Sequence, residues 1–160
     1  MEVVGDSDEM IQEGLRLAEK FKYQATIKVP CTPDGLIACR ELSRNCIKVN
    51  VTLIFSPSQA ILAAKAGATY VSPFVGRVYD QSFDGIKLIE EISDVYATHH
   101  AKTQVLAASI RDVHQVASAF RVGADICTIP PKVFTGMYKH ILTDKGLELF
   151  DADWTKLVGG

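Results

Sequence analysis

The sequence predicts an α/β protein, and more specifically an incomplete β/α barrel of the TIM type with about six of its eight strands. Short β-type segments alternate with amphipathic helical segments along the chain, a pattern typical of parallel sheets with crossover helices. The helical segment 59–68 aligns without gaps with the segment 115–124, and both end in Gly-Ala before a predicted strand. Serial repetition of one unit favours a closed barrel over a doubly wound sheet.

Prolines and cap residues delimit the predicted elements. Ser7 or Asp8 is expected to cap the first helix. Pro30 ends a strand because it has no amide hydrogen for the ladder, and Thr32 with Pro33 opens the next helix. In chain order, the predicted strands lie near residues 2–4, 25–29, 47–55, 69–72, 104–108 and 125–129. The predicted helices span about residues 8–20, 33–45, 57–66, 84–98 and 113–122, and the chain from about 131 is helical with a break near Thr143.

Residue types support these boundaries. Residues 47–55 are the longest β-type run, and Ser56-Pro57 after it has the order of an N-cap and first-turn proline. Gly67 and Gly123 suit left-handed helix C-caps. Polar residues dominate the segment before residue 84, which is predicted to be a loop. We expect residues 1–160 to form one domain, a truncated barrel that lacks two β/α units.

Composition restricts the classes of function. The net charge of −2 gives no electrostatic reason to expect nucleic acid or an anionic membrane as a partner. No apolar run approaches the roughly 18 residues of a membrane helix, and the acidic amino terminus lacks a signal-peptide pattern. The four cysteines, none in a C-x-x-C pair, are expected to be buried thiols of a cytoplasmic protein. No spacing typical of metal ligands is present.

Lys28 is the most informative residue, because a charge is costly inside a short apolar strand. It lies near the carboxyl end of its strand, where parallel α/β proteins bind ligands. One interpretation is a lysine whose stem packs on an edge strand while its ammonium stays in water. The other is a buried, desolvated amine that attacks a carbonyl and forms a Schiff base.

Further polar residues lie at the ends of the other predicted strands. Taken singly, each suits an ordinary role as a core hydrogen-bonding group, a cap or a solvated surface charge. Taken together, they would meet at the carboxyl-end rim of one sheet and suit Schiff-base chemistry on a phosphorylated sugar, with arginines binding the phosphate. The set comprises Glu2, Asn50, Thr52, Ser72, Phe74, Arg77, Ser109 and Arg111.

Five ordered motifs resemble the transaldolase family, most closely its short-chain branch, which also contains the fructose-6-phosphate aldolases. The resemblance covers essentially the whole chain, including Leu142-Thr143-Asp144-Lys145-Gly146 and Asp153-Trp154. The motifs are Ile27-Lys28-Val29-Pro30-Cys31-Thr32 with Gly35-Leu36, Asn50-Val51-Thr52-Leu53-Ile54-Phe55-Ser56, Ala66-Gly67-Ala68, Ser72-Pro73-Phe74-Val75-Gly76-Arg77 and Ala107-Ala108-Ser109-Ile110-Arg111.

The resemblance implies a mechanism and a role for each residue. Lys28 would form the Schiff base, and Glu2 with Thr52 would hold the water that shuttles protons. Asn50 would bind a substrate hydroxyl, and the remaining residues would line the substrate and phosphate site: Ser72, Phe74, Arg77, Ser109 and Arg111. The implied reaction moves a dihydroxyacetone unit between sugar phosphates of the pentose phosphate pathway, such as fructose 6-phosphate, erythrose 4-phosphate and sedoheptulose 7-phosphate, without metal or cofactor.

Two further implications concern the branch and the completeness of the site. Aldolase members carry glutamine at the position of Glu2 and tyrosine at that of Phe74, so this sequence is similar to the transaldolases. The two preceding β/α units of the family, one of which supplies the aspartate base for the C4 hydroxyl, have no counterpart here. We therefore expect either an impaired transaldolase or an inactive barrel that serves as an assembly or sugar-phosphate-binding module. Open strand edges and the family pattern both favour a homo-oligomer.

Overall fold

A computed structural model describes residues 1–159 and their side chains, except the side chain of Tyr23. The chain divides into two compact units, the first from Met1 to Ile129 and the second beginning at Pro130. All the residues predicted for the functional site belong to the first unit.

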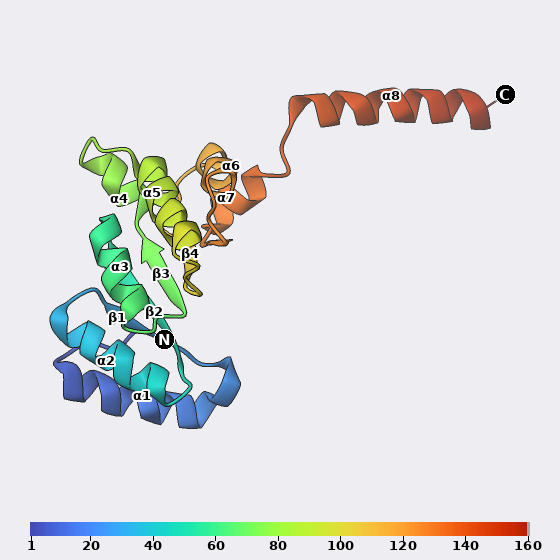
Figure 1. Ribbon diagram of the computed structural model, residues 1–160. Coiled ribbons are helices and arrows are strands. Elements are labelled where there is room, and N and C mark those ends of the chain that lie inside the picture. Colours follow the sequence, from blue (N-terminus) through green and yellow to red (C-terminus); the bar gives the residue numbers. More distant parts are fainter. Residues whose placement is uncertain (160) are drawn as a thin grey trace. The chain divides into compact units, whose positions relative to one another are not determined.

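The first unit contains a five-stranded parallel sheet whose strands follow one another in chain order (Figure 1). A helix lies between each strand and the next. This sequential order confirms the predicted fold class, a part of a TIM-type barrel. The strands are β1 (Thr26–Pro30), β2 (Lys48–Ile54), β3 (Tyr70–Pro73), β4 (Gln104–Ala107) and β5 (Ile126–Cys127). The helices are α1 (Ser7–Phe21), the 3-10 turn η1 (Lys22–Gln24), α2 (Pro33–Arg44), α3 (Pro57–Lys65), α4 (Val75–Asp80), α5 (Gly85–Thr98) and α6 (Val113–Arg121).

The core lies between the sheet and its crossover helices. Alternate strand residues are fully buried beneath helices α1 to α3, among them Ile27, Val29, Val49 and Val51. The opposite side chains, including Lys28 and Asn50, remain partly exposed. Because side chains alternate along a strand, the polar residues of β1 and β2 share the face turned away from the helices.

The amino-terminal elements differ from the prediction in two places. Asp6, not Ser7 or Asp8, caps α1: its carboxylate accepts from the Glu9 amide at 2.9 Å, and Glu9 accepts from the Asp6 amide at 3.0 Å. The strand predicted at residues 2–4 is reduced to one parallel bridge between Glu2 and Lys28. The chain turns at Gly5, whose φ is +122°, too soon for a longer ladder.

Strand β2 contains an irregularity that shifts its register against β3. Val51 pairs with Val71, but the next paired residue is Ile54, and Leu53 between them has a φ of +59°. The alternation of side chains between the two faces of the sheet therefore fails at the end of this strand. Ile54 becomes fully buried, while Leu53 does not.

The segment predicted as a polar loop before residue 84 instead begins with a short helix, α4. Its backbone is held by the β4 end, since the Val75 amide donates to the Ala108 carbonyl and the Gly76 amide to the Ser109 carbonyl, both at 3.0 Å. This tertiary contact was not visible in the local sequence pattern.

The second unit contains α7 (Pro131–Gly136) and α8 (Ile141–Val158) (Figure 1). The predicted break near Thr143 lies slightly earlier, because His140 caps α8 by accepting from the Leu142 amide at 3.1 Å. In the part of the chain that the structure describes, no helix is both long and apolar enough to span a membrane.

Candidate active site

Lys28 and Glu2 meet on the exposed face of β1. The Lys28 ammonium lies 3.3 Å from a Glu2 carboxylate oxygen, and the two side chains are 32% and 51% exposed. The backbone bridge explains the contact: the Lys28 amide donates to the Met1 carbonyl at 2.7 Å, and the Val3 amide donates to the Lys28 carbonyl at 3.0 Å. The lysine is thus half-buried and paired with a carboxylate, rather than enclosed as the desolvated amine of the second interpretation.

Thr52 lies on the neighbouring strand and is fully buried. Its residue pairs in register with Pro30, two positions beyond Lys28 on β1. The Thr52 hydroxyl has no hydrogen-bond partner among the described atoms. Leaving a buried hydroxyl unpaired costs roughly 1–3 kcal/mol, so this group is a strong candidate for contact with a polar ligand.

Asn50 and Ser72 form a hydrogen-bonded pair across β2 and β3. The Ser72 hydroxyl donates to the Asn50 side-chain oxygen at 2.8 Å, and Ser72 is only 2% exposed. Asn50 itself pairs in register with Lys28 on β1. The bond to Ser72 occupies the amide oxygen and leaves the amide NH₂ group as a donor next to the lysine strand.

Phe74, Arg77 and Arg111 belong to a second group of side chains, around helix α4. The Arg77 guanidinium lies over the Phe74 ring, 4.7 Å from its centre. Both arginines line a pocket of about 590 Å³. The other residues that line it are Phe55, Val78, Asp80, Gln81 and Phe83. Two guanidinium groups beside one cavity are suited to binding a phosphate.

Ser109 and Gly76 bring this second group close to β4. Ser109 has a φ of +60°, which turns the chain just past the strand. A Cβ atom on Gly76 would lie 2.7 Å from Arg111 Nε and 2.9 Å from the Ser109 hydroxyl. Only glycine therefore allows α4 to approach the segment that carries Ser109 and Arg111.

Asp80 is a site residue that sequence reasoning missed. Its carboxylate forms a bidentate ion pair with Arg111, through both terminal nitrogens of the guanidinium. This hydrogen-bonded pair raises the pKa of Arg111 above its ordinary value. Asp80 stands three residues after Arg77, a spacing that would have indicated a shared helix face had a helix been predicted there. Nothing in the sequence links it to Arg111, 31 residues away.

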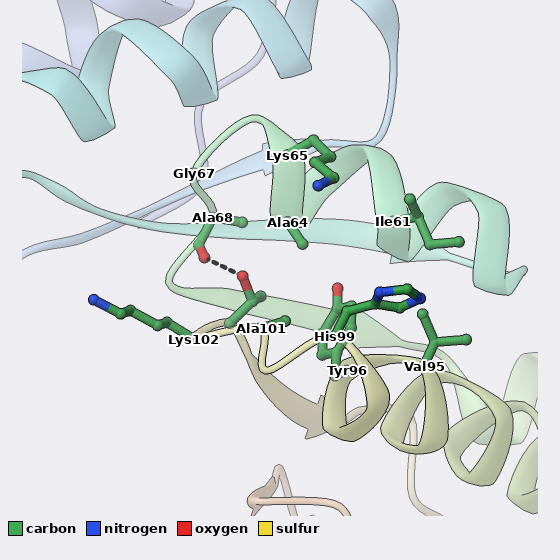
Figure 2. Close-up of a pocket in the computed structure, with 11 residues that line it drawn as sticks. Ile61, Ala64, Lys65, Gly67, Ala68, Val95, Tyr96, His99, Ala101 and Lys102 are labelled. Atoms are coloured by element: carbon green, nitrogen blue, oxygen red, sulfur yellow. Dashed lines mark hydrogen bonds between the residues drawn. The ribbon is translucent and has the colours of Figure 1, made fainter.

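The sheet has a different pocket at its other end. This pocket has a volume of about 640 Å³. It is lined by residues of α3 and α5 and of the loops that follow these helices, including Lys65, Tyr96, His99 and Lys102 (Figure 2). Two of its lining residues are joined by a hydrogen bond from the Thr103 hydroxyl to the Ala68 carbonyl, 2.7 Å long. These loops precede β3 and β4 and so lie at the amino ends of the strands. Ligands of parallel α/β sheets bind at the carboxyl ends, and the polar groups described above lie there, so we place the candidate site with them.

The cysteines and histidines take no part in this site. Among residues 1–159, no group of three potential ligands is arranged to hold a metal ion. All four cysteines are free thiols, but only Cys39 is buried as predicted: Cys31 and Cys127 are partly exposed and Cys46 is exposed. Burial raises the pKa of Cys39 to about 11 and that of Cys127 to about 11, which makes both thiols poor nucleophiles.

Comparison with known proteins identifies one family. A family model described as "Transaldolase/Fructose-6-phosphate aldolase" matches residues 1–159. A "Probable transaldolase" from Paracoccus denitrificans is 54% identical over 154 residues, covering 96% of this chain and 70% of the relative. Another from Caulobacter vibrioides is 55% identical over 148 residues, covering 92% and 68%.

A solved structure of a mandelate oxidase variant resembles this chain in fold. The TM-score is 0.60 at 16% sequence identity, over 80% of this chain and 48% of the other. At this identity the likeness concerns the arrangement of strands and helices alone.

Proposed function

The chain belongs to the transaldolase/fructose-6-phosphate aldolase family, and we propose that it transfers a dihydroxyacetone unit between sugar phosphates through a Schiff base on Lys28. The observation that carries this proposal is the Lys28–Glu2 pair, with 3.3 Å between ammonium and carboxylate. An amine must lose a proton before it attacks a carbonyl, and the Glu2 carboxylate is within reach to accept it.

The proposed reaction begins when the Lys28 amine attacks the ketone carbon of a ketose phosphate. Loss of water gives an iminium ion, which accepts the electron pair of the C3–C4 bond as that bond breaks. The C4 hydroxyl gives its proton to water and the aldose phosphate leaves, while the dihydroxyacetone unit remains bound to Lys28 as an enamine until it attacks the carbonyl of an acceptor aldose. Glu2 and the unpaired Thr52 hydroxyl are proposed to relay protons through water while the imine forms and hydrolyses.

The remaining residues are proposed to bind substrate. The Asn50 amide, oriented by Ser72, would donate to a sugar hydroxyl. Arg77 and Arg111 would bind the phosphate in the pocket that they line, with Phe74 supporting Arg77. Ser109, whose hydroxyl lies near Gly76, would contact the substrate. Glu2 and Phe74 are the residues that, by resemblance, favour transaldolase over aldolase activity.

No residue of the described chain is proposed as the base for the C4 hydroxyl. By resemblance that role belongs to an aspartate in β/α units ahead of the segment that begins near Glu2. Formation of the Schiff base on Lys28 is therefore the step that the described residues support, and borohydride trapping tests that step directly.

A binding module without turnover is the second candidate function. The observation that favours it is that Lys28 does not line the arginine pocket, which is formed by α4 and residues after it, by Phe55 after β2 and by Arg111 after β4. Such a pocket would bind sugar phosphates whether or not the amine reacts.

Borohydride trapping tests the proposal. We expect incubation with fructose 6-phosphate followed by reduction to add one reduced sugar-derived group to the protein, located at Lys28 by peptide mass spectrometry. Lys48→Arg is the control for substitution of a lysine, because Lys48 is an exposed lysine of β2. This variant should form the borohydride-trapped adduct to the same extent as the wild type. Binding of fructose 6-phosphate with no adduct would leave the binding module instead.

We also propose that the protein forms a homo-oligomer through α8, in the cytoplasmic setting that its unpaired thiols support. None of the residues of α8 is buried, and its apolar side chains recur at helical spacing. The exposed stripe comprises Leu147, Phe150, Trp154 and Leu157. A second copy of this chain is the proposed cover, and we expect Trp154→Glu to lower the mass measured by light scattering. An unchanged mass would show that the stripe is not the interface.

A further inference from the structure

Asp80 occupies a position that none of the roles above explains. It is the last residue of α4 and lines the arginine pocket together with Arg77 and Arg111. A carboxylate is unexpected in a site for an anion, because it repels the ligand. We propose that Asp80 is a positioning residue, which holds the Arg111 guanidinium in the orientation that binds the phosphate group of the substrate. The inference rests on the proposed function for the identity of the ligand.

The geometry of the pair supports positioning. Each carboxylate oxygen of Asp80 accepts from a different terminal nitrogen of Arg111. This bidentate arrangement fixes both the direction and the plane of the guanidinium, which a single hydrogen bond would not. It uses two of the five N–H donors of arginine and leaves three for a ligand. Arg111 Nε is also confined on the side of Gly76.

Arg77 and Arg111 are held in different ways. The Arg77 guanidinium rests on the Phe74 ring. The Arg111 side chain is 51% exposed, and among the described residues its guanidinium forms an ion pair with the Asp80 carboxylate. Without Asp80, the long Arg111 side chain would sample several rotamers and would have to be ordered when the ligand binds. With Asp80, that ordering has already taken place.

The charges of the pocket remain favourable for an anion. Arg77 and Arg111 contribute two positive charges and Asp80 one negative charge among the residues that line it. The pair is on the surface, where ion pairs contribute little to stability. Replacing Asp80 should therefore alter binding without unfolding the protein.

A double-mutant cycle tests the proposal, with inorganic phosphate as the probe and titration calorimetry on the full chain at low ionic strength. If Asp80 acts through Arg111, Asp80→Ala should weaken phosphate binding about five- to tenfold in the wild-type background. In an Arg111→Ala background, the same change should leave affinity equal or slightly tighter. Equal weakening in both backgrounds would overturn the proposal, as would tighter binding in the wild-type background or no phosphate binding by the wild type.

Two further measurements separate positioning from damage to the fold. Asp80→Glu, which keeps the carboxylate, should recover part of the affinity lost in Asp80→Ala. Glu90→Gln, which removes the carboxylate of an exposed Lys87–Glu90 pair on α5, should leave phosphate binding unchanged. No recovery with glutamate, or an equal loss with Glu90→Gln, would contradict a specific role for Asp80.

Kinetics with the sugar phosphate distinguish this inference from the proposed function. With fructose 6-phosphate, Asp80→Ala should raise the concentration needed for half-maximal trapping while the rate at saturation stays within about twofold of wild type. Absence of trapping in the wild type would refute the proposed function and leave the phosphate cycle as an independent test. Normal trapping with an unchanged half-maximal concentration would refute the role of Asp80 alone.

Discussion

The candidate site has two parts that are built differently. The first part, the lysine cluster, consists of Lys28, Glu2, Thr52 and the Asn50–Ser72 pair. All of these residues belong to β1, β2 and β3 or to the segment bridged to β1. The arginine pocket is formed mainly by the short helix α4 and the segment after β4, with Phe55 contributed from the end of β2. In the first part, strand register determines which side chains are neighbours. In the second, position depends on a glycine contact, a positive φ angle and an ion pair.

The difference suggests that the two parts can fail independently. A substitution in the lysine cluster should abolish the covalent chemistry while phosphate still binds. A change around α4 should weaken phosphate binding while the amine keeps its reactivity at saturating substrate. Four substitutions test this separation.

Lys28→Arg should have the largest effect, complete loss of the borohydride-trapped adduct. Arginine keeps the positive charge opposite Glu2 but stays protonated and cannot act as the nucleophile. Intact-protein mass spectrometry measures the adduct, and calorimetry should show phosphate affinity within about twofold of wild type. An adduct of wild-type yield in this variant would exclude Lys28 as the reactive amine.

Glu2→Gln should slow imine formation by about 10²-fold, because an amide cannot accept the proton that the ammonium must lose. The rate is measured by quenching the reaction with borohydride at increasing times. Glu19→Gln on the exposed surface of α1 is the matched control. An unchanged rate in Glu2→Gln would separate the carboxylate from the chemistry and leave it only an ion-pairing role.

Gly76→Ala should destabilise the protein by roughly 1–3 kcal/mol, as expected for overpacking. The new methyl group would meet Ser109 and Arg111. Urea unfolding measures the loss, and phosphate binding should weaken with it. Gly146→Ala is the control, because a Cβ built there has nothing within 4 Å apart from its chain neighbours and the backbone of its own helix. Equal stability of the two variants would show that α4 tolerates displacement.

Phe74→Leu should have the smallest effect, about a two- to fivefold loss of phosphate affinity. Leucine fills much of the same space but lacks the ring face over which Arg77 lies, an interaction of about 0.5–1 kcal/mol at exposed sites. Phe21→Leu removes a similar contact, with Lys20, far along the chain from the pocket. If both variants bind phosphate as the wild type does, Arg77 does not need the ring for its position.

The same division decides what the sequence alone could reveal. Lys28, Asn50 and Thr52 were predicted to meet at the carboxyl-end rim of one parallel sheet, because strand order and strand ends are encoded locally. The ladder then brought Lys28 opposite Asn50. The proximity of Glu2 to Lys28 required the bridge between their backbones, although the predicted first strand was reduced to that bridge.

The arginine pocket was less predictable from the sequence. Arg77 and Arg111 were identified, but a polar segment was predicted where α4 forms, because a six-residue helix has too little periodicity to be recognised. Asp80 was missed for the same reason, and its contact with Arg111 depends on how two distant segments pack. Similarly, Asp6 was overlooked as the cap of α1 because several adjacent residues were plausible caps.

Residues 1 to 3 cover part of the β1 edge of the sheet and also take part in the proposed chemistry. The same short segment pairs with the backbone of Lys28 and carries the carboxylate that faces its amine. Any fraying of this segment would uncover the edge of β1 and withdraw the proton acceptor in one event. The Lys28 amide donates to the Met1 carbonyl. Its rate of hydrogen–deuterium exchange would therefore measure how often this segment opens and the Lys28 amine loses the Glu2 carboxylate.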